Sequence, residues 1–239
     1  MTMNAEVRSA RGERGARERV GLRVGGALAI VGGLGYFVVL LLHGDLPDQT
    51  TATALEHIAG RPEWPLLKLS LIAFVLCWAG AFHLLADSLS DATSRVLGRL
   101  AAIVVLLGAA LVLVEYSILG YGVKNVADAW ATATGPDQES LLLVGEALLG
   151  VTGGLFLNFI AWLIGLPYLL MGLAVARDDG YPAWLGWLAA AAGAGALFSG
   201  ATRFLGMEIV PFPVLYGAFV VPLTLWLAAV GVLMWRRAG

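Results

Sequence analysis

The stretch from Val96 to Tyr121 constrains this chain more than any other. It is apolar for long enough to cross a bilayer, which takes about 20 residues of α-helix, and it carries one carboxylate, Glu115, near its far end. A charge inside such a helix costs about 2.5–3.5 kcal/mol on insertion scales, so this carboxylate needs a charged or hydrogen-bonding partner or a functional role. The segment therefore predicts a membrane protein with a polar site inside it.

The composition predicts the same class. Hydrophobic residues make up 59% of the chain and charged residues only 13%, whereas soluble domains are about 25% charged. The net charge is −2, and the arginines cluster at the ends of apolar spans instead of forming one patch, which argues against a nucleic-acid partner. Cys77 is the single cysteine, so an intrachain disulfide is excluded. The strong excess of arginine over lysine suggests a GC-rich bacterial genome.

The apolar runs predict an all-α, polytopic membrane protein with one six-helix transmembrane domain over residues 24–239. We expect spans at about 24–42, 64–86, 97–120, 150–175, 184–206 and 214–235. Residues 1–23 alternate arginine with glutamate, which predicts a disordered basic cytoplasmic tail, with a short surface helix as the alternative.

The segments between the spans carry further signals. Thr50 to Ala59 predicts a short interfacial helix capped by Thr50 or Thr51. Tyr121–Ser140 is interpreted as a long loop, although its apolar residues recur at helical spacing. Leu141–Ala176 is too long for one straight span. We therefore expect a kink at Gly150, Gly153 and Gly154, between an outer extension of 136–150 and the part that crosses the membrane, and a second bend at Pro167.

Basic residues predict the orientation. With the N-terminus inside, the cytoplasmic segments hold eleven of the fifteen basic residues: Arg8, Arg11, Arg14, Arg17, Arg19, Arg23, Arg95, Arg99, Arg177, Arg236 and Arg237. Basic residues concentrate on the cytoplasmic side of membrane proteins. We therefore expect both termini in the cytoplasm and a multi-pass protein of the cell inner (plasma) membrane.

Charged residues within the spans predict one candidate pocket. Lys68 lies a turn into the second span, Glu115 about five residues from the outer end of the third, and Arg203 near the outer end of the fifth. Because they come from three helices at one depth, we predict a ligand or ion pocket in the outer half of the bundle, with Glu208 beside it. Glu146 joins the pocket if the outer part of the fourth segment folds over.

Within this pocket we expect Arg203 to be the closer partner of Glu115, because a guanidinium binds a carboxylate in two-point geometry. Gly108 and Gly122 lie seven residues either side of Glu115, so the carboxylate should face into the bundle. The alternative is structural ion pairing near the interface, with the cations reaching to water.

The histidines and Asn158 are secondary candidates. His43 and His57 fall on the outer side and His83 near the inner end of the second span, so at most His43 and His57 can meet. We therefore expect no metal and no cofactor. Asn158 predicts a hydrogen bond between helices. The familiar catalytic signatures HExxH, GxSxG, the P-loop and CxxC are all missing from the sequence.

Two stretches carry a resemblance. Tyr121-Gly-Val-Lys-Asn-Val-Ala-Asp-Ala-Trp130 and Tyr181-Pro-Ala-Trp-Leu-Gly-Trp187 resemble sequences of an uncharacterised bacterial family of six-span integral membrane proteins, of the domain-of-unknown-function type. The resemblance runs from about residue 25 to the end of the chain. It implies an inner-membrane protein of this helix count and brings no activity, substrate or catalytic residue.

Three classes of function stay open. The first, which we expect, is binding or transport of a small molecule, lipid or ion through the polar pocket. The second is an intramembrane enzyme acting on a lipid, with Glu115 as acid or base and His43 or His57 assisting. The third is a structural or assembly subunit of a membrane complex. The lipid bilayer is the one partner that the composition implies, and protein partners are not readable from the sequence.

Overall fold

The computed structural model describes residues 2–43, 50–207, 209–211 and 214–239, with side chains from residue 15 onward except that of Tyr216. The described residues are almost all helical and contain no β-strand. Six of the helical segments are long and apolar enough to cross a membrane. The prediction of an all-α protein with six membrane-spanning helices is therefore confirmed.

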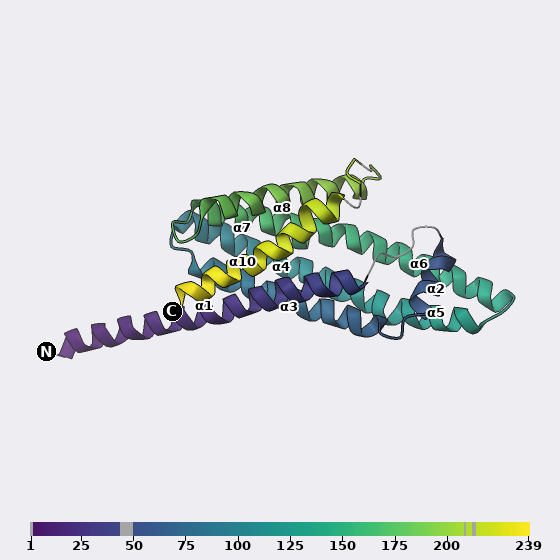
Figure 1. The fold of residues 1–239 in the computed structure, drawn as a ribbon, viewed down its shortest axis with the longest axis horizontal. Coiled ribbons are helices and arrows are strands. Elements are labelled where there is room, and N and C mark those ends of the chain that lie inside the picture. The colour runs from purple at the N-terminus through teal and green to yellow at the C-terminus, as the bar shows by residue number, and fades with distance from the viewer. Residues whose placement is uncertain (1, 44–49, 208, 212–213) are drawn as a thin grey trace.

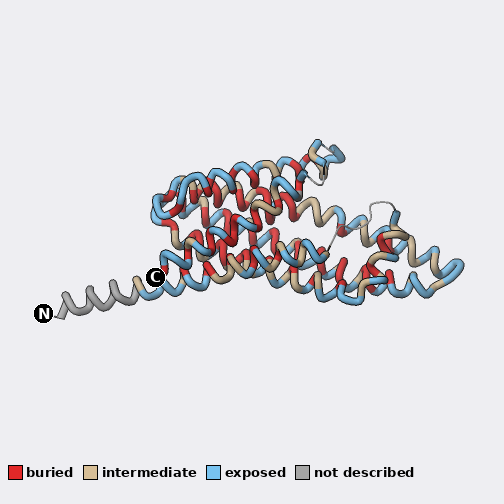
Figure 2. Tube along the Cα trace, viewed as in Figure 1, coloured by how far each residue is buried: buried red, intermediate tan, exposed pale blue. Residues whose placement is uncertain are grey.

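The six spans form a ring in which chain neighbours are also neighbours in space (Figure 1). The order is α1 (Thr2–His43), α3 (Trp64–Ser88), α4 (Ala92–Ser117), the fourth span, α8 (Ala183–Phe204) and α10 (Val221–Arg237). The fourth span is the end of the continuous helical segment Pro136–Arg177, whose last part is α7 (Leu166–Arg177), and α10 packs against α1 to close the ring. Short connections favour such adjacency. The buried residues line the surfaces where the helices face one another (Figure 2).

The two ends of the bundle differ. Both termini lie at one end, which we call the termini end (Figure 1). At the other, the extension end, α4 continues through a π-helical turn, η1 (Ile118–Gly122), into α5 (Val123–Thr132), and α6 (Pro136–Phe159) runs back along it. Here α2 (Thr51–Ala59), capped by Thr50 as expected, packs on both α5 and α6.

The extension corrects one prediction. Residues 121–140, expected to be a long loop, are helical except for the turn at 133–135. The apolar residues that recur at helical spacing in this segment explain the helix, since they are buried against α2 and the start of α3. The shared apolar cluster consists of Leu55, Ile58, Trp64, Leu119, Val123 and Ala127.

Of the two bends expected in the fourth span, the one at the glycines is absent. α6 runs without a break through Gly150, Gly153 and Gly154, where an added Cβ would meet open space. The irregularity comes later, at the π-helical turn η2 (Ile160–Gly165), just before Pro167. A proline ring clashes with the carbonyl four residues earlier, and a wider turn relieves that clash. The turn η3 (Leu215–Val220) precedes Pro222 in the same way.

The basic N-terminal segment also differs from its prediction. Instead of a disordered tail, α1 is helical from Thr2 and continues into the first span (Figure 1). Its sequence places Glu13 four residues before Arg17, and Arg14 four before Glu18, which are helix-stabilising spacings.

Small residues let α7 and α8 pack with their backbones nearly touching. A Cβ on Gly186 would lie 2.2 Å from the backbone nitrogen of Ala176, and one on Gly193 would lie 2.5 Å from that of Leu169. Such close approach is the usual packing of helices in membranes.

We expect Gly186→Ala to lower the free energy of unfolding by about 1–3 kcal/mol, because the methyl group overpacks the α7–α8 contact. Gly154→Ala is the matched control, since it adds the same methyl to a helix where nothing lies within 4 Å. That change should be neutral or stabilising by up to about 1 kcal/mol. Thermal unfolding in detergent measures both, and equal effects would contradict the packing described.

At the termini end, Asp178 joins two loops. Its Oδ2 accepts hydrogen bonds from the Ser90 backbone nitrogen (2.6 Å), the Ser90 hydroxyl (2.9 Å) and the Asp91 nitrogen (3.2 Å), and its Oδ1 accepts one from the Gly180 nitrogen (2.9 Å). Burial raises the pKa of Asp178, but the bonds from Asp91, Ser90 and Gly180 together outweigh it and lower the pKa below its ordinary value.

Because the folded state lowers this pKa, the carboxylate stabilises the fold above the ordinary pKa of about 3.9, and that contribution fades as the pH falls. Asp178→Asn should therefore cost about 1.5–3 kcal/mol at neutral pH, and its difference from the wild type should shrink below about pH 4. Asp179→Asn, at the exposed neighbouring carboxylate, is the control. A pH-independent loss would contradict the charged role of Asp178.

Candidate functional site

Lys68 lies in an enclosed polar cluster at the extension end. It stands on the second turn of α3 and is only 3% exposed. Its Nζ lies 4.5 Å from the ring centroid of Trp64 and 4.9 Å from that of Tyr116, and it shares a hydrogen bond with Nε2 of His43. A cation held against aromatic faces is stabilised, most strongly where water is excluded. Side chains of α1, α3 and α4 thus form a cage around one ammonium group.

The bond between Lys68 and His43 constrains their protons. An ammonium group and a protonated imidazole can only donate hydrogen bonds. One of the two must therefore accept, which requires a neutral imidazole nitrogen or a neutral amine at the Nζ–Nε2 contact.

Glu115 adds a carboxyl group to this cluster from α4. It is 3% exposed, and Lys68 is the cation whose charge acts on it. Among the described residues, no ion pair within 4 Å includes Glu115, and its buried Oε2 has no hydrogen-bond partner. An unsatisfied buried acceptor costs about 1–3 kcal/mol, more when charged. This oxygen can therefore receive a proton or a donor from a ligand.

Local structure brings these groups together. The π-helical turn η1 begins three residues after Glu115, and Trp64 Nε1 donates to the carbonyl of Leu119 within it (3.0 Å). Gly120 lets α3 approach, since a Cβ there would lie 2.8 Å from the Cβ of Lys68. Single π-turns inside α-helices often mark functional positions.

Arg61 ties the end of α1 to the rim of the cluster. Its guanidinium donates to the backbone carbonyls of Leu42 (3.0 Å) and His43 (2.5 Å), which are exposed acceptors at a helix C-terminus. It also lies 3.4 Å from Nε2 of His57, and burial followed by the charge of Arg61 lowers the pKa of His57. At neutral pH His57 is therefore a neutral imidazole beside a permanent cation.

A row of aromatic polar groups leads from the cluster into the bundle. Tyr116, next to Glu115, shares a hydrogen bond of 3.2 Å with the hydroxyl of Tyr36. The Tyr36 ring lies 4.8 Å from that of Trp78, which is 6.1 Å from Tyr168. Within the described structure, Trp78 Nε1 and the Tyr168 hydroxyl are buried without a hydrogen-bond partner. Polar groups thus reach the middle of the spans.

The structure brings Lys68, Glu115 and His43 together and places His57 at the rim, against Trp64 (ring centroids 6.1 Å apart). The other candidates lie elsewhere. The expected ion pair between Glu115 and Arg203 is absent from the described residues, because Arg203 lies on α8, outside the contact between α3 and α4, and bonds the Val210 carbonyl at 3.3 Å.

Glu146 is exposed on α6 and does not fold over the site. Asn158 donates a hydrogen bond to the Gly154 carbonyl of its own helix (3.0 Å). The prediction that it bonds another helix is therefore wrong. Glu208 lies outside the described residues.

Sequence reasoning missed the aromatic members of the site. Trp64 stands at the start of the second predicted span, where a tryptophan usually lies at the membrane interface, but it is fully buried. Tyr36 and Tyr116 were not singled out, although Tyr116 directly follows Glu115. A tyrosine beside an intramembrane carboxylate is the one signal that pointed to them.

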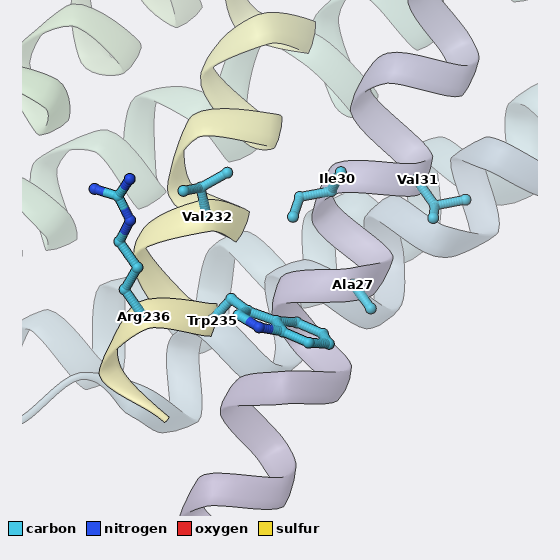
Figure 3. Close-up of a pocket in the computed structure, with 6 residues that line it drawn as sticks. All are labelled: Ala27, Ile30, Val31, Val232, Trp235 and Arg236. Atoms are coloured by element: carbon cyan, nitrogen blue, oxygen red, sulfur yellow. The ribbon is translucent and has the colours of Figure 1, made fainter. Parts of the chain in front are cut away.

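Two hollows on the surface lie away from this cluster. One, of about 430 Å³, lies between α1 and α10 and is lined by Ala27, Ile30, Val31, Val232, Trp235 and Arg236 (Figure 3). The other, of about 530 Å³, lies on the extension and is lined by Glu56, Ala59, Gly60, Trp130, Ala131 and Gln138. Neither includes Lys68 or Glu115. In the described part of the chain, no three His, Cys, Asp or Glu side chains gather as a metal site.

Comparison with known proteins adds no relative, since no family model, curated protein or solved structure matches the chain.

The pairing of Lys68 with Glu115 predicts strong coupling between them. Lys68→Met alone leaves the carboxyl group buried without its cation and should cost about 3–5 kcal/mol of unfolding free energy. Adding Glu115→Gln should recover a large part of that loss. The matched control combines Glu115→Gln with Arg203→Met, whose effects should add. Unfolding in detergent of all variants measures both cycles, and coupling to Arg203 instead of Lys68 would overturn the assignment.

Proposed function

We propose that the protein binds a small molecule, lipid or ion at the cluster of His43, Lys68 and Glu115, or carries it across the bilayer. Of these possible ligands, we propose the proton. The single observation that carries the proposal is Glu115, buried beside a caged lysine with one oxygen left without a hydrogen-bond partner. Ionisable groups inside a membrane bundle mark ion or substrate sites more often than simple packing.

The closed geometry favours a proton over a larger ligand. The cluster is covered by Trp64 and Tyr116, and neither surface hollow reaches it. A proton needs no cavity and can pass along hydrogen bonds. His43, half-buried at the end of α1, connects Lys68 with the edge of the bundle. On the inner side, the Tyr116 ring lies against Lys68 and its hydroxyl shares a hydrogen bond with Tyr36.

Lys68 from α3 is the charge that acts on Glu115, and the charge of Glu115 acts in turn on Tyr36 of α1. His43 of α1 bonds Lys68, the charge of Arg61 acts on Lys68 from the segment before α3, Tyr116 follows Glu115 on α4, and Tyr168 of α7 interacts with Tyr36. A carboxyl, an amine and an imidazole gathered in one cluster can hold different numbers of protons with little movement.

We also propose the location of this site. The excess of arginine at the termini end supports an orientation with that end in the cytoplasm of a bacterial cell and the extension on the outer side of the inner membrane. The cluster then lies in the outer half of the bilayer and exchanges its proton with the outside.

A structural role is the second candidate, favoured by the close packing of the cage. The enzyme hypothesis has less support, since neither of the two hollows on the described surface includes Glu115 or a histidine.

Difference infrared spectroscopy of the protein in lipid nanodiscs tests the proton site. We therefore expect a pH-dependent C=O band that belongs to a buried carboxyl. The band should vanish in Glu115→Gln and persist in Glu146→Gln, the exposed control. If the spectrum shows no such band, or keeps it in Glu115→Gln, Glu115 does not exchange a proton and the structural role stands.

A further inference from the structure

The groove between α1 and α10 is shown in Figure 3. It lies near the termini end, because Val232, Trp235 and Arg236 are on the last turns of α10, and none of its lining residues belongs to the cluster at the extension end. Its walls are apolar, with Ala27, Ile30 and Val31 on α1 and Val232 on α10. The ring of Trp235 extends from α10 toward Ala27 (Figure 3). The volume of the groove is about 430 Å³.

The groove exists because the two helices cross with their backbones in near contact. A Cβ on Gly26 would lie 2.7 Å from the carbonyl oxygen of Gly231, and one on Gly33 would lie 2.6 Å from that of Thr224. Beside this tight crossing, the small side chain of Ala27 leaves space that larger residues border. The backbone contact keeps the helices from moving together to fill it.

Two arginines stand at the same end of the groove. Arg236 lines it, four residues after Val232 on α10. Arg23 is exposed on α1, four residues before Ala27, and therefore on the same helix face. Among the described side chains, neither guanidinium enters an ion pair. By contrast, the neighbouring Arg237 packs over the ring of Tyr181 at 4.6 Å.

We propose that this groove binds one anionic phospholipid from the surrounding leaflet. Arg23 and Arg236 bind the phosphate from the two helices, Trp235 lies at the level of the glycerol and ester groups, and an acyl chain runs along Ile30, Val31 and Val232. Charge complementarity selects the anionic headgroup, because two guanidinium groups without acidic partners flank an apolar slot at the membrane surface. Tryptophan is the residue that suits the boundary between headgroups and chains.

A zwitterionic lipid fills the slot equally well, but it has no net negative charge to neutralise Arg23 and Arg236. A helix of a second protein would bury the arginines against apolar surface, which is costly. The lipid site is independent of the proposed proton site, since the two share no residue and lie at opposite ends of the bundle.

Native mass spectrometry and thermal unfolding of the delipidated protein, titrated with phosphatidylglycerol or phosphatidylcholine, test the proposal. We expect the wild type to retain phosphatidylglycerol and to unfold at a higher temperature in its presence, and phosphatidylcholine to do neither. The double variant Arg23→Gln with Arg236→Gln should weaken phosphatidylglycerol binding about 30-fold. Each arginine near a membrane surface contributes about 1 kcal/mol to the binding of anionic lipid, and about 1.4 kcal/mol corresponds to a tenfold change in affinity.

Three further variants make the test specific. Arg177→Gln removes an exposed arginine at the same end and should leave binding unchanged. Arg23→Lys with Arg236→Lys keeps the charge and should retain most of the affinity. Ala27→Phe fills the slot, keeps both arginines and should abolish binding. Equal binding of the two lipids, or undiminished binding in the double glutamine variant or in Ala27→Phe, would overturn the site.

Discussion

The burial of Lys68 beside Glu115 is the interaction on which the extension end depends. Moving an ammonium and a carboxylate out of water is costly, and their mutual attraction offsets this only with good geometry and further hydrogen bonds. Here Lys68 receives the support of two aromatic faces and an imidazole, whereas one oxygen of Glu115 receives none. This asymmetry distinguishes the cluster from an ion pair whose only role is to hold helices together.

The helices at the extension end keep this cluster away from water. Trp64 belongs both to the cage and to the apolar cluster shared by α2, α5 and η1, so the wall of the polar site is also part of the core of the extension. Its bond to the Leu119 carbonyl occupies an acceptor that the π-helical turn presents. Changes in the extension therefore act directly on the environment of Lys68. At the termini end, by contrast, Asp178 and close glycine contacts hold the helices.

The sequence was sufficient for six spans and for the importance of Glu115, because hydrophobic length and a buried charge are local properties. It was not sufficient for the partner of Glu115. Arg203 and Lys68 lie at a similar depth by residue count, and only the order of helices around the ring decides which of them the carboxylate meets. The same limit explains Trp64, whose burial depends on α2 folding back over the start of α3. The predicted bend at the glycines is wrong because glycine only permits a bend, whereas Pro167 requires one.

The central claim is that the buried charges serve exchange of a ligand or proton and not stability. Its most direct test is the free energy of unfolding of the variant that replaces both charges with apolar side chains of similar size, Lys68→Met with Glu115→Leu. Replacing a buried ion pair in this way is often neutral or stabilising by about 1–4 kcal/mol. We expect the variant to be at least as stable as the wild type. A loss of about 3 kcal/mol or more would contradict the account, because it would show that the pair holds the fold together.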